Sequence, residues 1–237
     1  MPATGCLSSR IRPWYLINRY MTTSTAIFAS IACGYLCGSV PFGYLAGKLK
    51  GIDIRQHGSG NIGATNAIRV LGKGIGIPVF LCDVLKDWLP VWLAAGWIAQ
   101  SGAAAELVTT GKVLTGFAAV LGHMFTFWLG FKGGKGIATT AGVLAGVSLA
   151  GMIGGWIAFL VFLFAFRYVS LASLAAAVGV PTAMAVQMAR EGHWDFVMLG
   201  FGLVVMVLAF VRHRSNIQRL LAGTESRAFV KKKPQDS

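Results

Sequence analysis

The sequence predicts an all-α membrane protein, a polytopic chain with about seven transmembrane helices. Of its 237 residues, 55% are hydrophobic and only 12% are charged, and the mean hydropathy is +0.66. Soluble domains carry about a quarter charged residues, so this composition is typical of an integral membrane protein. The net charge of +13 fits the same class, because excess Lys and Arg mark cytoplasmic loops and headgroup contacts. No regular interleaving of aromatic and basic residues indicates a nucleic-acid surface.

Seven apolar segments are expected to span the membrane. The run 137–166 holds 30 residues, whereas one span needs about 20. Gly151, Gly154 and Gly155 offer a break, so the run is counted as two short spans. A five-span arrangement, with this run counted once and another span lost, is the main alternative. The segments cover about residues 26–46, 77–99, 107–129, two parts of 137–166, 171–189 and 196–211.

The membrane-integral domain is predicted to cover residues 26–226. Residues 1–25 form an N-terminal extension with three arginines and no acidic residue, and Met21 is an alternative start. Residues 227–237 form a basic tail. The four cysteines show neither metal-site spacing nor a CxxC pair, so no metal is expected.

The positions of the lysines and arginines predict the orientation of the chain. Fifteen of the 21 lie after spans one, three and five or after span seven, which is one face of a seven-span arrangement. Positively charged loops stay in the cytoplasm, so the C-terminus is predicted inside and the N-terminus outside. The three arginines of residues 1–25 oppose this orientation. Three polar stretches would then share the cytoplasmic face and converge on one site.

The first polar stretch, residues 53–76, has the features of a phosphate-binding loop. Its glycines let the backbone turn sharply and present N–H groups, and a helix expected over 64–71 follows directly. On that helix Thr65 and Arg69 share a face at i,i+4 spacing, with Asn66 adjacent. The alternative is a capped loop whose arginines meet lipid headgroups. The candidates in this stretch are Arg55, Gly58, Ser59, Gly60, Asn61, Thr65, Asn66, Arg69 and Lys73.

The second polar stretch, from His123 to Gly136, repeats the pattern. Gly-Lys-Gly-Ile occurs at 72–75 and again at 134–137, each time before an apolar span. Two helix N-termini, each with a lysine, would hold one or two phosphates. The loop is not a Walker motif, because a glycine replaces the Ser or Thr after the lysine. A tight turn with snorkelling lysines is the alternative. The candidates here are His123, Lys132, Gly133, Gly134 and Lys135.

The third stretch runs from Arg212 to Glu225, where the last span leaves the membrane. On a helix His213 and Asn216 share one face at i,i+3 spacing, which headgroup contact does not readily explain. Attraction to anionic lipid accounts for most other bases of the tail, including its three terminal lysines. Glu225 is assigned as structural or uncertain.

Other features narrow the chemistry. Asp83 and Asp87 flank Lys86 inside the second span, and intramembrane carboxylates usually pair, so a structural role is expected with Asp83 facing the bundle. The sequence has no His-x4-Asp pair, no Gly-x-Ser-x-Gly elbow and no metal-ligand cluster. Any catalysis must therefore rest on positioning of phosphates and stabilisation of charge.

The motifs resemble those of the bacterial acyl-phosphate:glycerol-3-phosphate acyltransferase family over about residues 26–226. The resemblance implies an inner-membrane enzyme that makes lysophosphatidic acid from acyl phosphate and glycerol 3-phosphate, the first acylation of phospholipid synthesis. It implies no cofactor, and an acyl-phosphate-producing enzyme as upstream supplier. The matching segments are Ser39-x-Pro-x-Gly-Tyr44, Asp53 to Asn66, Arg69-Val-Leu-Gly72, Gly122 to Thr139 and Arg212 to Glu225.

Residue roles follow from this resemblance and from the chemistry of the side chains. Lys135, Arg69 and the glycine amides are expected to hold two anions and to steady the carbonyl oxygen. The attacking hydroxyl needs a base, and either His213 or a substrate phosphate can serve. Ser39 joins the substrate-binding set. The expected catalytic residues are Ser59, Arg69, Lys135, His213 and Asn216.

The alternative function is a small-anion or phosphate transporter. Such a protein would carry polar residues near the middle of the membrane, on paired broken helices. Here the polar residues gather at one interface, and the spans are largely Gly, Ala, Leu and Val. The sequence therefore favours an interfacial enzyme.

Overall fold

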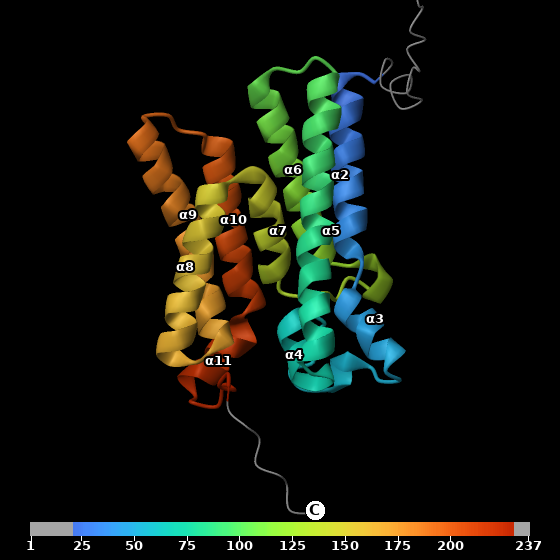
Figure 1. Ribbon diagram of the computed structural model, residues 1–237, viewed down its shortest axis with the longest axis vertical. Helices are drawn as coiled ribbons and strands as arrows, with labels where there is room; N and C mark the ends of the chain where they lie inside the picture. Colours follow the sequence, from blue (N-terminus) through green and yellow to red (C-terminus); the bar gives the residue numbers. More distant parts are fainter. Residues whose placement is uncertain (1–20, 230–237) are drawn as a thin grey trace, which may run out of the picture.

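A computed structural model describes residues 21–229, and every regular element within that range is helical (Figure 1). The terminal segments 1–20 and 230–237, with most of the predicted extension and the terminal lysines, lie outside the described residues. The α-helices are α2 (Thr23–Ser39), α3 (Phe42–Leu49), α4 (Ala64–Leu71), α5 (Lys73–Gln100), α6 (Ala105–Met124), α7 (Ile137–Val147), α8 (Leu149–Phe166), α9 (Val169–Glu191), α10 (Phe196–Arg212) and α11 (Arg214–Leu221). Two short 3-10 turns cover Ile54–Gln56 and Phe127–Leu129.

The helices form two packed groups with α7 between them (Figure 1). One group is α2, α5 and α6, and the other is α8, α9 and α10. Glycines allow α2 to approach α6 closely, since a Cβ on Gly38 would lie 2.0 Å from the carbonyl oxygen of Ala119. Close backbone approach at small residues is the usual basis of helix packing in membranes.

The lengths and hydropathy of the helices identify a membrane protein. Four segments of the described chain are long and apolar enough to cross a bilayer. A fifth candidate is α10 together with α11, which bends away by 59°. Helix α5 is 28 residues long but carries three charged residues at its centre, and α7, at 11 residues, is about 16 Å long and too short to span. The all-α prediction is confirmed, whereas seven spans remain a prediction. The four segments are Thr23–Leu49, Ala105–Leu129, Leu149–Phe166 and Val169–Glu191.

The run 137–166 is divided into two helices, but the predicted position of the break is wrong. The helix breaks at Ser148, whose hydroxyl accepts a hydrogen bond from the Gly151 N–H at 3.2 Å and so caps α8. The glycines that were expected to break the run lie inside α8 and let it pack on α9. A Cβ on Gly154, for example, would lie 2.3 Å from the Cβ of Ala183.

The first predicted span is also interrupted. Helix α2 ends at Ser39 and α3 begins at Phe42, with Val40 and Pro41 between them. Pro41 cannot donate a backbone hydrogen bond, so the helix does not run on smoothly. The expected helix over 64–71 is confirmed as α4, with the same bounds.

The polar stretches gather at one end of the bundle. In Figure 1, α2 begins at the upper end, whereas α3, α4 and α11 lie at the lower end. The described chain therefore begins and finishes at opposite ends of the bundle.

Candidate active site

A pocket of about 370 Å³ opens where the three polar stretches meet. The first stretch contributes three neighbouring residues, the second contributes Phe125 and Lys135, and the third contributes Ser215 and three arginines. No acidic side chain is found among the described residues that line it. The predicted convergence of the three stretches is confirmed. The lining residues are Ser59, Gly60, Asn61, Phe125, Lys135, Val211, Arg212, Arg214, Ser215 and Arg219.

The loop of the first stretch is organised by the buried side chain of Asn66. Its Oδ1 accepts a hydrogen bond from the Ser59 N–H at 2.8 Å. Its Nδ2 donates to the carbonyls of Asn61 at 2.8 Å and His57 at 3.1 Å, and lies 3.3 Å from a third, that of Ile54. Because backbone groups use both ends of this carboxamide, Asn66 shapes the loop from inside. It does not line the pocket, which the loop enters through residues 59–61.

The loop of the second stretch is built differently. The Gly133 N–H donates to the Met124 carbonyl at 3.1 Å, and the Gly134 N–H donates to the His123 carbonyl at 3.0 Å. The prediction that these two amides are exposed for an anion is therefore wrong. A Cβ on either glycine would lie 2.0 Å from an atom of His123, so the glycines serve to bring this loop against α6.

Arg212, the last residue of α10, also holds this loop in place. Its guanidinium donates to the carbonyls of Gly133 and Gly134, with the shortest contacts at 2.8 Å. The sequence placed Arg212 in the third stretch but gave it no role. The pattern that could have indicated a role for Arg212 is the helical face that it would share with Asn216 and Arg219. Arg214 also lines the pocket, whereas its charge was expected to serve only attraction to anionic lipid. Ser215 and the apolar Phe125 and Val211 line it too and were not singled out.

Lys135 is the pocket residue whose charge is most changed by its surroundings. Its ammonium donates to Oδ1 of Asn216. Burial and, to a smaller extent, the nearby charge of Arg219 lower the pKa of Lys135 to about 8, although the charge of Glu225 acts against them. Two other cations act in the same direction as Arg219, namely Arg69 and Arg212. A phosphate would relieve this repulsion, so the pocket is built to attract an anion.

Glu225 contacts Asn216, the residue to which Lys135 donates. Its carboxylate accepts hydrogen bonds from Asn216 Nδ2 at 2.8 Å, Arg219 Nε at 2.6 Å and Ser170 at 2.9 Å. Burial raises the pKa of Glu225, but these hydrogen bonds outweigh burial and leave it below its usual value. Glu225 therefore stays ionised and orients Asn216 toward Lys135.

His213 lies beneath the pocket and does not line it. Its Nδ1 is 2.8 Å from the Ala209 carbonyl oxygen and must donate to it. In a neutral ring Nε2 is then the acceptor. His213 and Asn216 are both buried, but His213 lies at the break between α10 and α11, so their position on one helical face stays a prediction.

Several predicted site residues lie elsewhere. Ser39 and His123 are buried in the bundle, and Arg55 pairs with Asp53 at 2.6 Å and lies over the ring of Tyr44. Gly58 has a φ of +62° and supports the loop turn. Four further predicted site residues are exposed and lie outside the pocket lining: Thr65, Arg69, Lys73 and Lys132.

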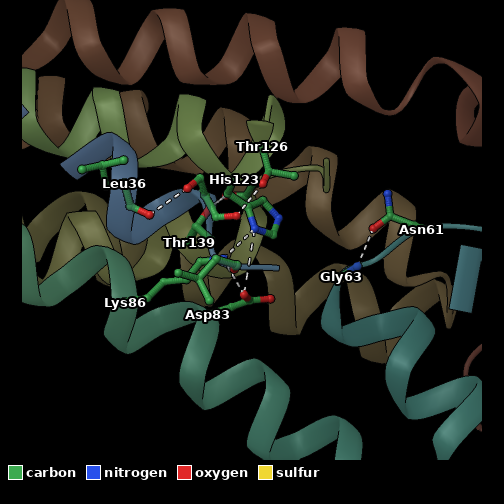
Figure 2. A network of polar contacts seen from close by, with 11 residues as sticks. Leu36, Asn61, Gly63, Asp83, Lys86, His123, Thr126 and Thr139 are labelled. Carbon is green, nitrogen blue, oxygen red and sulfur yellow. Dashed lines mark hydrogen bonds and ion pairs between the residues drawn. The ribbon is translucent and has the colours of Figure 1, made fainter. Parts of the chain in front are cut away.

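The predicted pairing inside the second span is confirmed. Lys86 Nζ lies 2.8 Å from Asp83 Oδ1, and both side chains are almost fully buried (Figure 2). His123 joins this pair from α6, with its Nδ1 3.1 Å from Lys86 Nζ. Asp83 faces the bundle as expected.

A helical membrane bundle with a cationic pocket at one end is the arrangement expected of a membrane protein that acts on an anionic ligand. Residues 28–223 match the model of the family described as glycerol-3-phosphate acyltransferase. The chain is 43% identical to the glycerol-3-phosphate acyltransferase of Geobacter sulfurreducens, over 83% of this chain and 94% of that protein. It is 44% identical to the one from Methylorubrum populi, over 85% and 93%. The chain belongs to the glycerol-3-phosphate acyltransferase family.

Solved structures agree with this assignment. The crystal structure of PlsY, an integral membrane glycerol 3-phosphate acyltransferase, in its glycerol 3-phosphate form matches with a TM-score of 0.74 and 38% identity. The match covers 85% of this chain and 94% of that chain. The lysophosphatidic acid form of PlsY matches with a TM-score of 0.72. The chain is therefore a membrane-integral acyltransferase, and the transporter alternative has no comparable support.

Proposed function

We propose that this enzyme transfers an acyl group from an acyl phosphate to glycerol 3-phosphate, giving lysophosphatidic acid and inorganic phosphate. The observation that carries the proposal is the pocket with four cationic side chains, which also has apolar lining from Phe125 and Val211. Both substrates bear phosphate, and one is a lipid. A site for them needs positive charge beside an apolar surface.

The reaction needs little chemistry from the protein. The hydroxyl oxygen of glycerol 3-phosphate attacks the acyl carbonyl carbon and forms the ester bond. The bond from that carbon to the phosphate oxygen breaks, and phosphate leaves with both bonding electrons. Because the acyl group arrives activated, the site has to hold two anions in line and stabilise the carbonyl oxygen as it gains charge. We assign this role to Lys135 and Arg212, which both line the pocket.

The acceptor for the hydroxyl proton is assigned to a substrate phosphate. The described residues that line the pocket include no carboxylate and no histidine. His213, the other candidate, lies under the pocket with Nδ1 turned to the Ala209 carbonyl. In this assignment the proton passes to the departing phosphate, and His213 supports the α10–α11 junction. Ser59 and Asn61 would bind the substrate from the first loop.

A direct assay tests the donor. Purified protein is supplied with glycerol 3-phosphate and either palmitoyl phosphate or palmitoyl-CoA, and lysophosphatidic acid and phosphate are measured. Equal amounts of both products from palmitoyl phosphate, without CoA, are expected. Product from palmitoyl-CoA alone would overturn the choice of donor while leaving the family assignment in place.

We also place the pocket at the cytoplasmic face of the bacterial inner membrane, where an acyl-phosphate-producing enzyme would supply the donor. The bias of Lys and Arg toward this end supports that orientation. A cysteine introduced at Gln56 or Gly223 should not be labelled by an impermeant thiol reagent applied to intact spheroplasts. The protein that carries only its native cysteines gives the background labelling. Efficient labelling at either position would reverse the orientation.

A further inference from the structure

The buried ammonium of Lys86 joins three helical segments. It has three N–H donors and three partners: Asp83 Oδ1 on its own helix at 2.8 Å, the Val40 carbonyl at 2.7 Å and His123 Nδ1 at 3.1 Å. The contact with Asp83 is an ion pair, and those with Val40 and His123 are hydrogen bonds. Val40 lies at the break between α2 and α3, and His123 lies on α6. One side chain thus connects α5 to the α2–α3 break and to α6 (Figure 2).

The partner on α6 leads directly to the second loop. Lys86 can only donate, so His123 Nδ1 accepts, and the ring proton resides on Nε2. That nitrogen faces Gly134, where an added Cβ would lie 2.0 Å away. The carbonyl of His123 accepts the Gly134 N–H at 3.0 Å. The ring and the backbone of His123 therefore both contact Gly134.

The loop in turn sets the positions of two pocket cations. Arg212 donates to the Gly133 and Gly134 carbonyls, and Lys135 is the next residue along the chain. Thr126 adds a second link from this region to the α2–α3 break, because its hydroxyl donates to the Ser39 carbonyl at 2.5 Å. A continuous set of contacts thus runs from the interior of the bundle to the phosphate-binding pocket.

We infer that Lys86 and His123 are positioning residues, which hold the 133–135 loop against α6 and thereby place Lys135 and Arg212 for substrate phosphate. This inference rests on the proposed function of the pocket. Neither side chain lines the pocket, so each acts through the glycine loop. A displacement of about 1 Å at such a site can lower the rate by roughly 100-fold.

A purely structural role for Lys86 makes a different prediction. Loss of folded protein lowers the amount of active enzyme, and so the apparent kcat, without changing KM. Displacement of the phosphate-binding cations raises KM for glycerol 3-phosphate in the molecules that remain folded. Comparing the change in KM with the change in apparent kcat therefore separates a positioning role from a purely structural one.

The main test compares Lys86→Met with Lys112→Met. Lys112 is a half-buried lysine on α6, eleven residues before His123 and outside the contact set, so it controls for loss of a membrane-embedded lysine. Lys86→Met is expected to raise KM for glycerol 3-phosphate by about tenfold or more, and Lys112→Met by less than about twofold. An unchanged KM in active Lys86→Met enzyme would overturn the inference.

A second pair covers the case in which Lys86→Met does not fold. His123→Leu removes the acceptor for Lys86, whereas His123→Asn retains an oxygen near the position of Nδ1. The inference requires a raised KM in His123→Leu and recovery of most of the loss in His123→Asn. Equal KM values for the two variants would contradict it.

A binding measurement separates this inference from the proposed function. Thermal stabilisation of the purified protein by glycerol 3-phosphate reports on the pocket without any acyl donor. If the wild-type protein were inactive with acyl phosphate, the proposed donor would fail. The shift of midpoint with ligand concentration would still show whether Lys86→Met weakens phosphate binding relative to Lys112→Met. Equal shifts in both variants would reject the positioning role.

Discussion

Gly-Lys-Gly-Ile occurs twice in this chain, and the two copies have different structures. In the first copy, Gly72 precedes α5 with a φ of +84°, and Lys73 is the first helical residue, exposed to solvent. In the second, Lys135 stands two residues before α7, and Gly136 precedes the helix with a φ of +85°. Lys135 is half-buried and donates to Asn216, whereas Lys73 lies outside the pocket lining. The same four residues therefore give a surface lysine in one place and a pocket cation in the other.

The difference comes from what surrounds each copy. Around Gly74 an added Cβ would meet nothing within 4 Å, whereas around Gly134 it would meet the ring of His123. The second copy is held between α6 and Arg212, which fixes where its lysine points. A basic glycine-rich motif thus predicts a flexible turn with charge, and only its packing decides whether the charge enters a site.

The largest expected effect is at the second copy. Lys135→Ala removes a charge-assisted contact to phosphate, which typically costs about 1.5–3 kcal/mol, or roughly 10- to 150-fold in kcat/KM. Steady-state kinetics with glycerol 3-phosphate as the varied substrate measure the effect. A value near wild type would mean that Lys135 does not contact either substrate.

The sequence predicted much of this arrangement because the relevant signals are local. A helix over 64–71 was expected directly after the glycine-rich turn, and the distribution of Lys and Arg predicted that the three stretches share one face. The pairing of Asp83 with Lys86 followed from the cost of a lone buried charge. Each of these needs only neighbours in the chain or a rule about membranes.

Other features depend on contacts between distant residues and could not be predicted. The amides of Gly133 and Gly134 were expected to bind an anion, but both donate hydrogen bonds to carbonyl oxygens at the end of α6. The break in the run 137–166 falls at Ser148 because its hydroxyl caps α8 and the nearby glycines pack on α9. Arg212 has no role that the sequence indicates, and the hydrogen bonds from its guanidinium to the second loop depend on a contact between distant residues.

The contribution of Lys135 to the binding of glycerol 3-phosphate should depend on pH. Burial lowers its pKa to about 8, so the protonated form that binds phosphate is lost as the pH rises through that value. In the free enzyme the protonated fraction falls about tenfold between pH 7 and pH 9, and KM for glycerol 3-phosphate should rise by up to that factor. Lys135→Arg stays charged throughout and should lose this alkaline limb even if its overall activity is lower. A limb that persists in Lys135→Arg would assign it to another group.

The glycines of the two copies should respond differently to a methyl group. Gly134→Ala places Cβ against His123 and is expected to lower the free energy of unfolding by about 1–3 kcal/mol, because a packed position tolerates little added volume. Gly74→Ala lies in the first turn of α5 with open space around it, and should be neutral or slightly stabilising. Thermal unfolding of both variants in detergent measures the difference. Equal midpoints would show that the second loop is not tightly packed on α6.

The smallest effect is expected for the lysine of the first copy. Lys73 is exposed at the start of α5, and interactions of exposed charges are typically worth less than about 1 kcal/mol. Lys73→Ala should therefore change kcat/KM by less than about fivefold, far below the loss in Lys135→Ala. Lys132→Ala is a matched comparison from the second loop, since Lys132 is exposed and also lies outside the pocket lining. If Lys73→Ala lost as much activity as Lys135→Ala while Lys132→Ala did not, a substrate phosphate would reach the N-terminus of α5. Both copies of the motif would then belong to the active site.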